Sequence, residues 1–463
     1  YRKVPMYKIN FKHPIHVHFI GIGGISMSGL AEVLLEEGFT VSGSDNKPSP
    51  LTEKLEAAGV SVFYGQKASN ITEGIDAVIF TAAIHEDNEE YQEAARRGIP
   101  MLTRAQFLGQ LMTNYEMPIA VSGTHGKTTT TSMLSHILLK AQADPTISVG
   151  GILNAIGGNI RVGHSEIFLT EACEYTNSFL EFFPKIGIIL NIDEDHLDFF
   201  KDLADIRRSF RKFAELIPAD GYLVINGEIE NLEEIAGNLP CKVVTYGMDS
   251  RMDYSAANIS YDELGRVSFD FLKKGDFAER ISLSVNGDHN VSNSLSALAA
   301  ADILSIPADV SGRGLNEFGG TKRRFEYKGE VNGIAVIDDY AHHPTEIKAA
   351  LKAAESYPHR EMWCVFQPHT YSRTKALFHD FTDALLLADH IVLADIYAAR
   401  ETDTLGVTSE ALAEELREKG ADAYYLPTFE EIEKFCLENC QKGDMLITMG
   451  AGDVVNIGEA LLK

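Results

Sequence analysis

Two segments of this 463-residue chain share one order: an apolar run, a glycine-rich turn, and a run whose apolar residues recur at helical spacing. The first covers residues 16–35 with the turn Gly21-Ile22-Gly23-Gly24, and the second covers 118–138 with the turn Gly123-Thr124-His125-Gly126. A strand that leads through glycines into a helix is typical of parallel α/β sheets whose turns bind phosphate groups. The chain is therefore predicted to contain two nucleotide-binding α/β units.

The second turn continues as Lys127-Thr128-Thr129, so a lysine and a hydroxyl follow its last glycine. Phosphate loops need this order, because the lysine neutralises the β- and γ-phosphates while the hydroxyl binds Mg²⁺. Only two residues separate the glycines, fewer than in a standard P-loop. We expect an ATP site that includes Gly123, Thr124, His125, Gly126, Lys127, Thr128 and Thr129, with Thr128 also a metal ligand.

The first turn is a weaker signal, because glycines after a strand also occur for packing alone. Asp45 ends the next apolar run, at the position where dinucleotide-binding folds have an acid that binds ribose. Glycines let backbone N–H groups approach a pyrophosphate at the start of a helix. The residues predict a nucleotide site here without separating NAD from UDP.

Further apolar runs follow at residues 40–45, 76–81, 166–170, 186–190, 334–338 and 363–366, with helical stretches at 345–355 and 375–388. A chain of this length exceeds what one hydrophobic core usually supports. We predict an α/β fold of three domains. They are a Rossmann-like N-terminal domain at 1–112, a central P-loop-type ATPase domain at 113–318, and a C-terminal Rossmann-like α/β domain at 319–463.

Composition excludes several classes of partner. Lys and Arg number 41 against 67 Asp and Glu, and a net charge of -26 would repel a nucleic acid backbone. No apolar run approaches the roughly 18 residues of a membrane span. The five cysteines have the spacing of neither a zinc site nor a disulfide framework. We expect a cytoplasmic protein without nucleic acid or membrane partners.

Polar side chains follow several of these runs, where a parallel sheet presents its ligands. After the runs at 166–170 and 186–190 come Glu171, Glu174, Asp193, Asp195 and His196, which predict a metal shell beside the phosphate loop. After the runs at 334–338 and 363–366 come Tyr340, His342, His369 and Arg373. Arg373 is suited to bind a carboxylate through two parallel hydrogen bonds.

In this order the segments resemble the Mur ligase family over about residues 16–455. The resemblance rests on the first turn with Met27-Ser28-Gly29, the loop 123–130, Glu171-Ala172-Cys173-Glu174, residues 191–198, Gly287-Asp288-His289-Asn290 with Asn293, Arg323-Arg324-Phe325, residues 338–344, and Phe366-Gln367-Pro368-His369 with Arg373. It implies that the three domains bind a UDP-linked substrate, ATP and an amino acid, in that order along the chain.

The resemblance also implies a role for individual residues. The UDP-linked substrate is expected at Gly21, Gly23, Gly24, Ser26, Met27, Ser28, Ser44, Asp45 and Thr81. Beyond the loop, ATP is expected at His289, Asn290, Asn293 and Arg324. Glu171 and His196 are implied as ligands of Mg²⁺ or Mn²⁺ together with Thr128. Tyr340, His342, His369 and Arg373 are expected around the amino acid, and Lys127, Glu171, His196, His342 and Arg373 are the expected catalytic residues.

Two segments bear on which branch of the family the chain resembles. Relatives that add later amino acids have a carboxylated lysine where this chain has Phe210 or Arg211, which favours the alanine-adding branch. Many relatives have an arginine where this chain has Thr370, the residue after His369. The alanine-adding branch implies an amide bond between L-alanine and the lactyl carboxylate of UDP-N-acetylmuramate, made through an acyl phosphate for peptidoglycan synthesis.

Other functions stay open at this level. A related ligase attaches a recycled tripeptide to UDP-N-acetylmuramate and needs a roomier amino-acid pocket. A non-catalytic nucleotide-binding sensor or a nicotinamide oxidoreductase would use only the first turn. Neither of these last two requires Lys127, Glu171 and His196, so we expect the enzyme, as a monomer or a homodimer.

Overall fold

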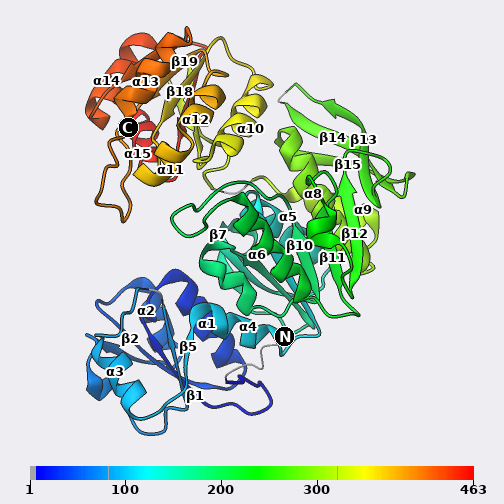
Figure 1. Ribbon diagram of the computed structural model, residues 1–463, viewed down its shortest axis with the longest axis vertical. Helices are drawn as coiled ribbons and strands as arrows, with labels where there is room; N and C mark the ends of the chain where they lie inside the picture. Colours follow the sequence, from blue (N-terminus) through cyan, green and yellow to red (C-terminus); the bar gives the residue numbers. More distant parts are fainter. Residues whose placement is uncertain (1–6, 82, 264, 321) are drawn as a thin grey trace. The chain divides into compact units, whose positions relative to one another are not determined.

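The computed structural model describes residues 7–81, 83–263, 265–320 and 322–463, so the first six residues of the predicted N-terminal domain lie outside it. The chain divides into two compact units. One contains Tyr1–Ile192, Arg207–Thr245 and Ala299–Ile306, and the other contains Asp193–Ile206, Tyr246–Leu298 and Pro307–Lys463. Figure 1 labels the elements from β1 to α15 along three α/β regions, which confirm the predicted three-domain fold class.

The first sheet is parallel and has the strand order β3-β2-β1-β4-β5. Its strands are β1 (His16–Ile20), β2 (Thr40–Asp45), β3 (Ser61–Tyr64), β4 (Ala77–Phe80) and β5 (Met101–Thr103). Its helices are α1 (Ile25–Glu36), α2 (Pro50–Ala57), η1 (Ala68–Asn70), α3 (Glu89–Arg96) and α4 (Arg104–Met112). Strand order reverses between β1 and β4, and ligands of such sheets bind at this switch point.

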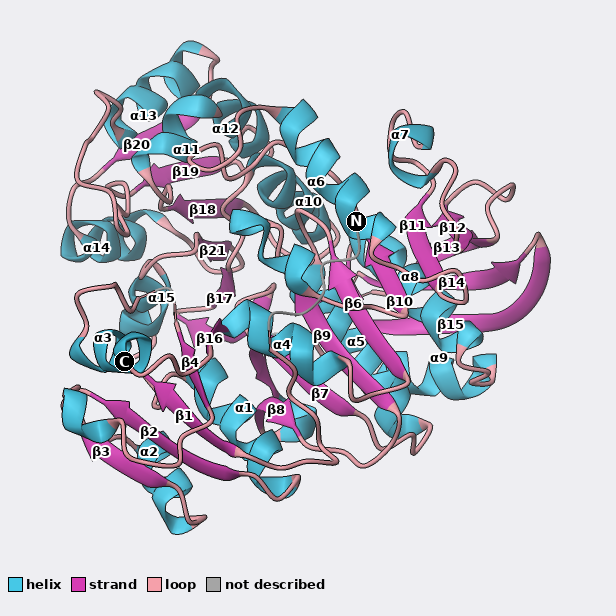
Figure 2. Ribbon diagram, turned by 60° about the horizontal axis from the view of Figure 1, so that its bottom comes forward, coloured by secondary structure: helices cyan, strands magenta, loops and turns pink. Residues whose placement is uncertain are grey.

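The strand of the second turn, β6 (Met117–Ser122), runs parallel between β9 (Ile167–Ala172) and β10 (Ile186–Ile189). These are the two runs expected to flank it, and Figure 2 shows the three side by side. Around them are α5 (Lys127–Lys140), β7 (Thr146–Leu153), η2 (Asn154–Ile156), β8 (Gly158–Arg161), η3 (Tyr175–Glu181), α6 (Leu203–Glu215), β11 (Tyr222–Asn226), α7 (Glu233–Ala236) and β12 (Lys242–Gly247).

An antiparallel meander, which the sequence analysis did not predict, belongs to the second unit. It consists of β13 (Tyr254–Tyr261), β14 (Arg266–Lys273) and β15 (Asp276–Asn286). The helices α8 (Asp288–Ile303) and α9 (Ala308–Glu317) follow it. The start of α8 therefore comes directly after a long strand, so that His289 lies in its first turn.

The C-terminal sheet has the order β16-β17-β21-β18-β19-β20. Only β16 (Glu326–Val331) is antiparallel; the others are β17 (Ile334–Asp339), β18 (Met362–Phe366), β19 (His390–Leu393), β20 (Asp422–Tyr425) and β21 (Met445–Met449). Its helices are α10 (Pro344–Glu355), α11 (Tyr371–Ala376), α12 (Phe378–Leu385), α13 (Ser409–Glu418), α14 (Phe429–Asn439) and α15 (Val455–Leu461).

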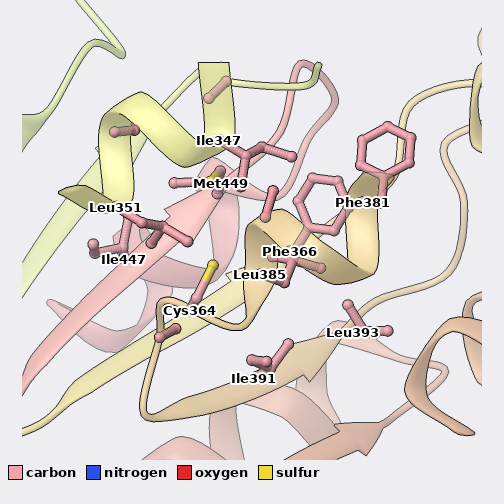
Figure 3. Packing of buried hydrophobic residues seen from close by; sticks show 14 of the residues in the cluster. Ile347, Leu351, Cys364, Phe366, Phe381, Leu385, Ile391, Leu393, Ile447 and Met449 are labelled. Carbon is pink, nitrogen blue, oxygen red and sulfur yellow. The ribbon is translucent and has the colours of Figure 1, made fainter. Parts of the chain in front are cut away.

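A buried cluster joins this sheet to α10 and α12, and Figure 3 shows Ile347 and Leu351 beside Phe366 and Phe381. The rings of Phe366 and Phe381 lie 5.6 Å apart between centroids, and both side chains are fully buried. Burying side chains of this size stabilises a fold by about 1.5–3 kcal/mol each. This core fixes the strand ends from which Tyr340 and His369 follow.

One predicted element is wrong. The helical stretch expected at 375–388 is two helices, α11 ending at Ala376 and α12 running from Phe378 to Leu385. Leu377 between them has φ -112° and ψ 24°, and its side chain is 7% exposed. Burying that leucine against the core breaks the helix, because its backbone leaves the helical region.

In the described part of the chain, no helix has the length and apolar character needed to cross a membrane.

Candidate active site

The second glycine turn is braced by the end of the neighbouring strand β10. Asn191 accepts a hydrogen bond from the backbone N–H of His125 at 2.7 Å and donates one to the His125 carbonyl at 3.0 Å. Gly126, which precedes α5, has φ +81°, a left-handed conformation that glycine adopts without a steric penalty. The turn is therefore held open at the N-terminus of α5, where N–H groups attract anions.

Lys127 folds back over this turn. Its Nζ donates to the carbonyl oxygens of Gly123 at 2.6 Å and Thr124 at 3.1 Å, and to Glu174 Oε2 at 3.1 Å. Burial alone would lower the pKa of Lys127, but the buried carboxylate of Glu174 raises it above its ordinary value. The ammonium group stays charged at neutral pH, as a phosphate ligand must.

Glu171 lies at the end of β9, directly beside the strand that leads into the phosphate loop. Its register partner is Val121, and that of Ala172 is Ser122, the residue before Gly123. Among the described residues, no group of three or more His, Cys, Asp or Glu is arranged to hold a metal ion alone. A cation at Glu171 would need further oxygens, such as the Thr128 hydroxyl and the phosphates of a nucleotide.

The first glycine turn is held by the end of β2. The backbone N–H groups of Gly21 and Ile22 both donate to the Ser44 carbonyl at 2.9 Å, and that of Gly23 donates to Asp45 Oδ2 at 2.8 Å. Asp45, expected at a ribose, thus also shapes the turn. The other residues expected at this site lie close to the turn in sequence or at strand ends. Met27 and Ser28 have buried side chains on α1, and the Ser44 hydroxyl donates to the buried Glu90 carboxylate. Thr81 directly follows β4.

In the second unit, Arg373 connects the C-terminal domain to the segment that contains the acidic residues 193–198. Its Nε and Nη2 each lie 3.0 Å from Asp195 Oδ1, and its Nη1 donates to His369 Nδ1 at 3.2 Å. Burial would raise the pKa of Asp195, but Arg373 foremost holds it well below its usual range. Next to it, His196 has φ +53°, an uncommon conformation for this residue type.

Two of the expected amino-acid residues are neutral histidines. Burial, with the charge of Arg373, lowers the pKa of His342 and of His369 to about 4, although Glu346 opposes the shift at His342. Their rings lie 5.8 Å apart between centroids, and His369 stacks on Tyr397 at 5.5 Å. A neutral His369 agrees with its Nδ1 accepting from Arg373. The two imidazole rings therefore add no positive charge beside the guanidinium of Arg373.

The residues expected at ATP in the second unit lie near the same cluster. The guanidinium of Arg324 lies 5.6 Å from the centroid of the Tyr340 ring, and its Nη2 is 3.7 Å from Glu346 Oε1. Burial lowers the pKa of His289 to about 4, and the charge of Arg324 acts in the same direction. Asn293 donates to Asn290 Oδ1 at 3.3 Å on α8. Arg324 thus lies near His289, and Asn290 and Asn293 lie on the same helix as His289.

Four residues that support the site were given no role by sequence reasoning: Asn191, Arg104, Glu346 and Tyr397. Asn191 directly follows the run at 186–190, so its place at a strand end was a usable signal. Arg104 likewise follows a strand, β5, and its Nη1 donates to Ser26 Oγ at 2.9 Å. The stacking of Tyr397 on His369 had no local signal, because a long stretch of sequence separates the two.

A phosphate loop with a half-buried lysine, a glycine turn at a switch point and a third α/β sheet together define a multidomain nucleotide-dependent enzyme. Three family models cover nearly the whole chain: "Mur ligase family, catalytic domain" at residues 16–116, "Mur ligase middle domain" at 121–301, and "Mur ligase, glutamate ligase domain" at 323–452. The chain belongs to the Mur ligase family, whose members use ATP.

Curated relatives match over nearly their full length. A UDP-N-acetylmuramate–L-alanine ligase of Agathobacter rectalis is 61% identical over 99% of this chain and 100% of its own. The enzyme of the same name from Lachnospira eligens is 59% identical over the same shares. Among solved structures, the UDP-N-acetylmuramate-alanine ligase MurC of Thermotoga maritima is 30% identical with a TM-score of 0.76, covering 97% of this chain and 98% of that chain.

Proposed function

We propose that this chain forms an amide bond between L-alanine and the lactyl carboxylate of UDP-N-acetylmuramate, at the expense of ATP. The observation that carries this proposal is full-length identity of about 60% to enzymes named for that reaction, combined with a complete phosphate loop. The reaction supplies a precursor of peptidoglycan. We keep the domain boundaries 1–112, 113–318 and 319–463 as part of the proposal.

The phosphates of ATP would bind at the N-terminus of α5. Lys127 would exchange its contacts with the Gly123 and Thr124 carbonyls for oxygens of the β- and γ-phosphates, while Glu174 keeps the ammonium group oriented. His289, Asn290 and Asn293 would contact the nucleotide's adenine side, and Arg324 its phosphates. Charge that spreads over the transferring phosphoryl group is stabilised by such preorganised cations.

A divalent cation fits the oxygen ligands near this loop. Thr128 lies in the first turn of α5, and Glu171 is the register neighbour of the strand that enters the loop. Hard oxygen donors of this kind suit Mg²⁺ or Mn²⁺, and we propose His196 as a further ligand. When bound, the ion would neutralise charge on the phosphate oxygens.

The chemistry needs activation, because a carboxylate resists attack by an amine and oxide is a poor leaving group. A lactyl carboxylate oxygen attacks the γ-phosphorus of ATP, the bond to the bridging oxygen breaks, and ADP leaves. The nitrogen of L-alanine then attacks the carbonyl carbon of the acyl phosphate. The tetrahedral intermediate expels inorganic phosphate and the nitrogen loses a proton, which leaves the amide.

The amino acid would bind in the cluster around Arg373. Its carboxylate would compete with Asp195 for the guanidinium, which offers two parallel N–H donors. The neutral rings of His342 and His369 add no positive charge that would repel the incoming amine. We place the reaction in the cytoplasm, because five free cysteines suit a reducing compartment.

The test is a coupled assay for ADP release with purified protein. We expect release only when ATP, UDP-N-acetylmuramate and L-alanine are all present, with one amide product formed per ADP. Replacing L-alanine by the tripeptide L-alanyl-γ-D-glutamyl-meso-diaminopimelate separates this function from that of murein peptide ligase, whose Psychrobacter arcticus structure is 26% identical with a TM-score of 0.66. A clear preference for the tripeptide would overturn the proposal.

A further inference from the structure

Arg104 lies near the first glycine turn and near the end of β9 beside the second. It was not part of any motif in the sequence analysis. It is the first residue of α4, and its Nη1 donates to the hydroxyl of Ser26 in the first turn of α1 at 2.9 Å. Its side chain is half-buried, and burial lowers its pKa, opposed by the thiolate form of Cys173 and by the carboxylate of Glu171. The guanidinium thus lies within electrostatic reach of both the first glycine turn and the end of β9.

Close backbone packing fixes this position. A Cβ atom at Gly109 on α4 would overlap the carbonyl oxygen of Glu181, at the end of η3, so the helix lies directly against the segment after β9. A Cβ atom at Gly29 on α1 would lie 2.8 Å from Cβ of Ile160 on β8. The helices α1 and α4 are therefore packed without spare room against β8 and the end of η3, respectively.

A guanidinium has five N–H donors in one plane, and the hydrogen bond to Ser26 uses one of them. Glu171, at the end of β9, lies on the side where the second nucleotide is proposed. Arg104 contacts the first turn, where the diphosphate is proposed to bind, and is within electrostatic reach of Glu171, beside the loop where the carboxylate is proposed to react. We propose that Arg104 binds an oxyanion of the UDP-linked substrate between the first glycine turn and Glu171, an inference that rests on the proposed function.

Two parts of that substrate carry suitable oxygens, the diphosphate and the lactyl carboxylate. Both would form charge-assisted hydrogen bonds with Arg104, which are about twice as strong as neutral ones. UDP-N-acetylglucosamine carries the diphosphate without the lactyl carboxylate, so comparing the two sugars identifies the oxyanion. The α1 N-terminus also attracts the diphosphate, so Arg104 would add to that site rather than create it.

The experiment compares Arg104→Met and Arg104→Lys with wild type by isothermal titration calorimetry against UDP-N-acetylmuramate, UDP-N-acetylglucosamine and an ATP analogue. Methionine keeps an extended side chain but no donor. We expect Arg104→Met to raise the Kd of UDP-N-acetylmuramate by about 10- to 100-fold, with partial recovery in Arg104→Lys and an unchanged Kd for the ATP analogue. Arg96→Ala, at an exposed arginine of α3, is the matched control.

An equal rise in Kd for both UDP-sugars shows that Arg104 binds the diphosphate. A rise confined to UDP-N-acetylmuramate shows that Arg104 binds the lactyl carboxylate. Either result supports the inference. Wild-type Kd values for both sugars in a folded Arg104→Met protein would overturn it. So would equal losses in the Met and Lys variants with a lowered Tm, which indicate a structural role. Failure of the wild-type protein to bind UDP-N-acetylmuramate would instead count against the proposed function.

Discussion

In the first glycine turn, backbone N–H groups donate to Ser44 and Asp45 at the end of β2, and the cation beside the turn, Arg104, comes from a different helix. In the second turn, the cation is Lys127 within the turn itself, paired with a buried glutamate from the neighbouring strand region. Both turns join a strand to a helix, yet only the second contains its own charge for a phosphate.

The difference shows how one local motif serves two ligands. A helix N-terminus binds a diphosphate through N–H groups and the helix dipole, which suffices for a substrate part that does not react. Transfer of a phosphoryl group needs a fixed cation where charge develops. We therefore propose that phosphoryl transfer takes place at the turn with Lys127, and that the turn with Asp45 positions the substrate.

The largest effect is expected at Lys127. Lys127→Ala should lower kcat for ADP release by about a thousandfold, since a preorganised cation stabilises the transition state by several kcal/mol. Steady-state kinetics measures this, with Lys140→Ala at the exposed end of the same helix as the control. Lys127→Ala leaves the Glu174 carboxylate buried without this cation, which can destabilise the fold. The double variant Lys127→Ala with Glu174→Gln removes that charge, so it separates a loss of catalysis from a loss of folding. Near-wild-type turnover would remove the distinction between the turns.

A smaller effect is expected at Arg373, outside both turns. Arg373→Ala should raise the KM for L-alanine by tens- to several-hundred-fold, since a bidentate charged pair in a closed site is worth roughly 2–4 kcal/mol. The KM values for ATP and the UDP-sugar should change little. Arg373→Ala with Asp195→Asn removes the buried unpaired carboxylate and separates binding from folding. An equal rise in all three KM values contradicts a role at the amino acid.

A still smaller effect is expected at Gly23 in the first turn. A Cβ atom there would lie 2.7 Å from Asp45 Oδ2, so the aspartate must move and its hydrogen bond to the Gly23 N–H weakens. Gly23→Ala should raise the KM of the UDP-sugar about tenfold without changing that of ATP. Gly319→Ala, where no described atom lies within 4 Å of the added Cβ, is the control. A rise in the ATP KM would argue that the turns act together.

The last effect concerns stability rather than catalysis, namely acid stability near the proposed ATP site. His289 has a pKa of about 4 when folded, below its ordinary 6.5, so the unfolded state takes up the proton first. Stability present above pH 6.5 should be lost as pH falls towards 4, by at most about 1.4 kcal/mol per pH unit. Urea unfolding at pH 7, 6 and 5 should show a shallower loss in His289→Gln than in His85→Gln, at an exposed histidine. Equal slopes would mean that His289 is not the group responsible.

Local sequence predicted the elements best where an apolar run and its turn lie together. The strands predicted at 16–20 and 40–45 match β1 and β2 residue for residue, because each lies next to a glycine turn or a helical run that marks its ends. The glycine turns were equally local. The break at Leu377 was not, since it depends on a leucine reaching a core made by distant strands.

The site residues show the same difference between a local sequence signal and long-range packing. Lys127 could be assigned from its neighbours along the chain, whereas the pairing of Arg373 with Asp195 joins residues 178 positions apart. Arg104 shows no motif, and its position depends on how α4 packs against η3. Long-range pairs of this kind follow from tertiary packing, which no window of sequence encodes.

The assignment of one nucleotide to each turn is tested most directly by calorimetry, in which a variant of each turn is titrated with both ligands. Lys127→Ala and Gly23→Ala would each receive an ATP analogue and UDP-N-acetylmuramate in separate experiments. We predict that Lys127→Ala loses affinity for the ATP analogue and keeps the wild-type Kd for UDP-N-acetylmuramate, while Gly23→Ala does the reverse. If one variant loses both ligands with its fold intact, or if the losses fall on the opposite ligands, the assignment of one nucleotide to each turn is contradicted.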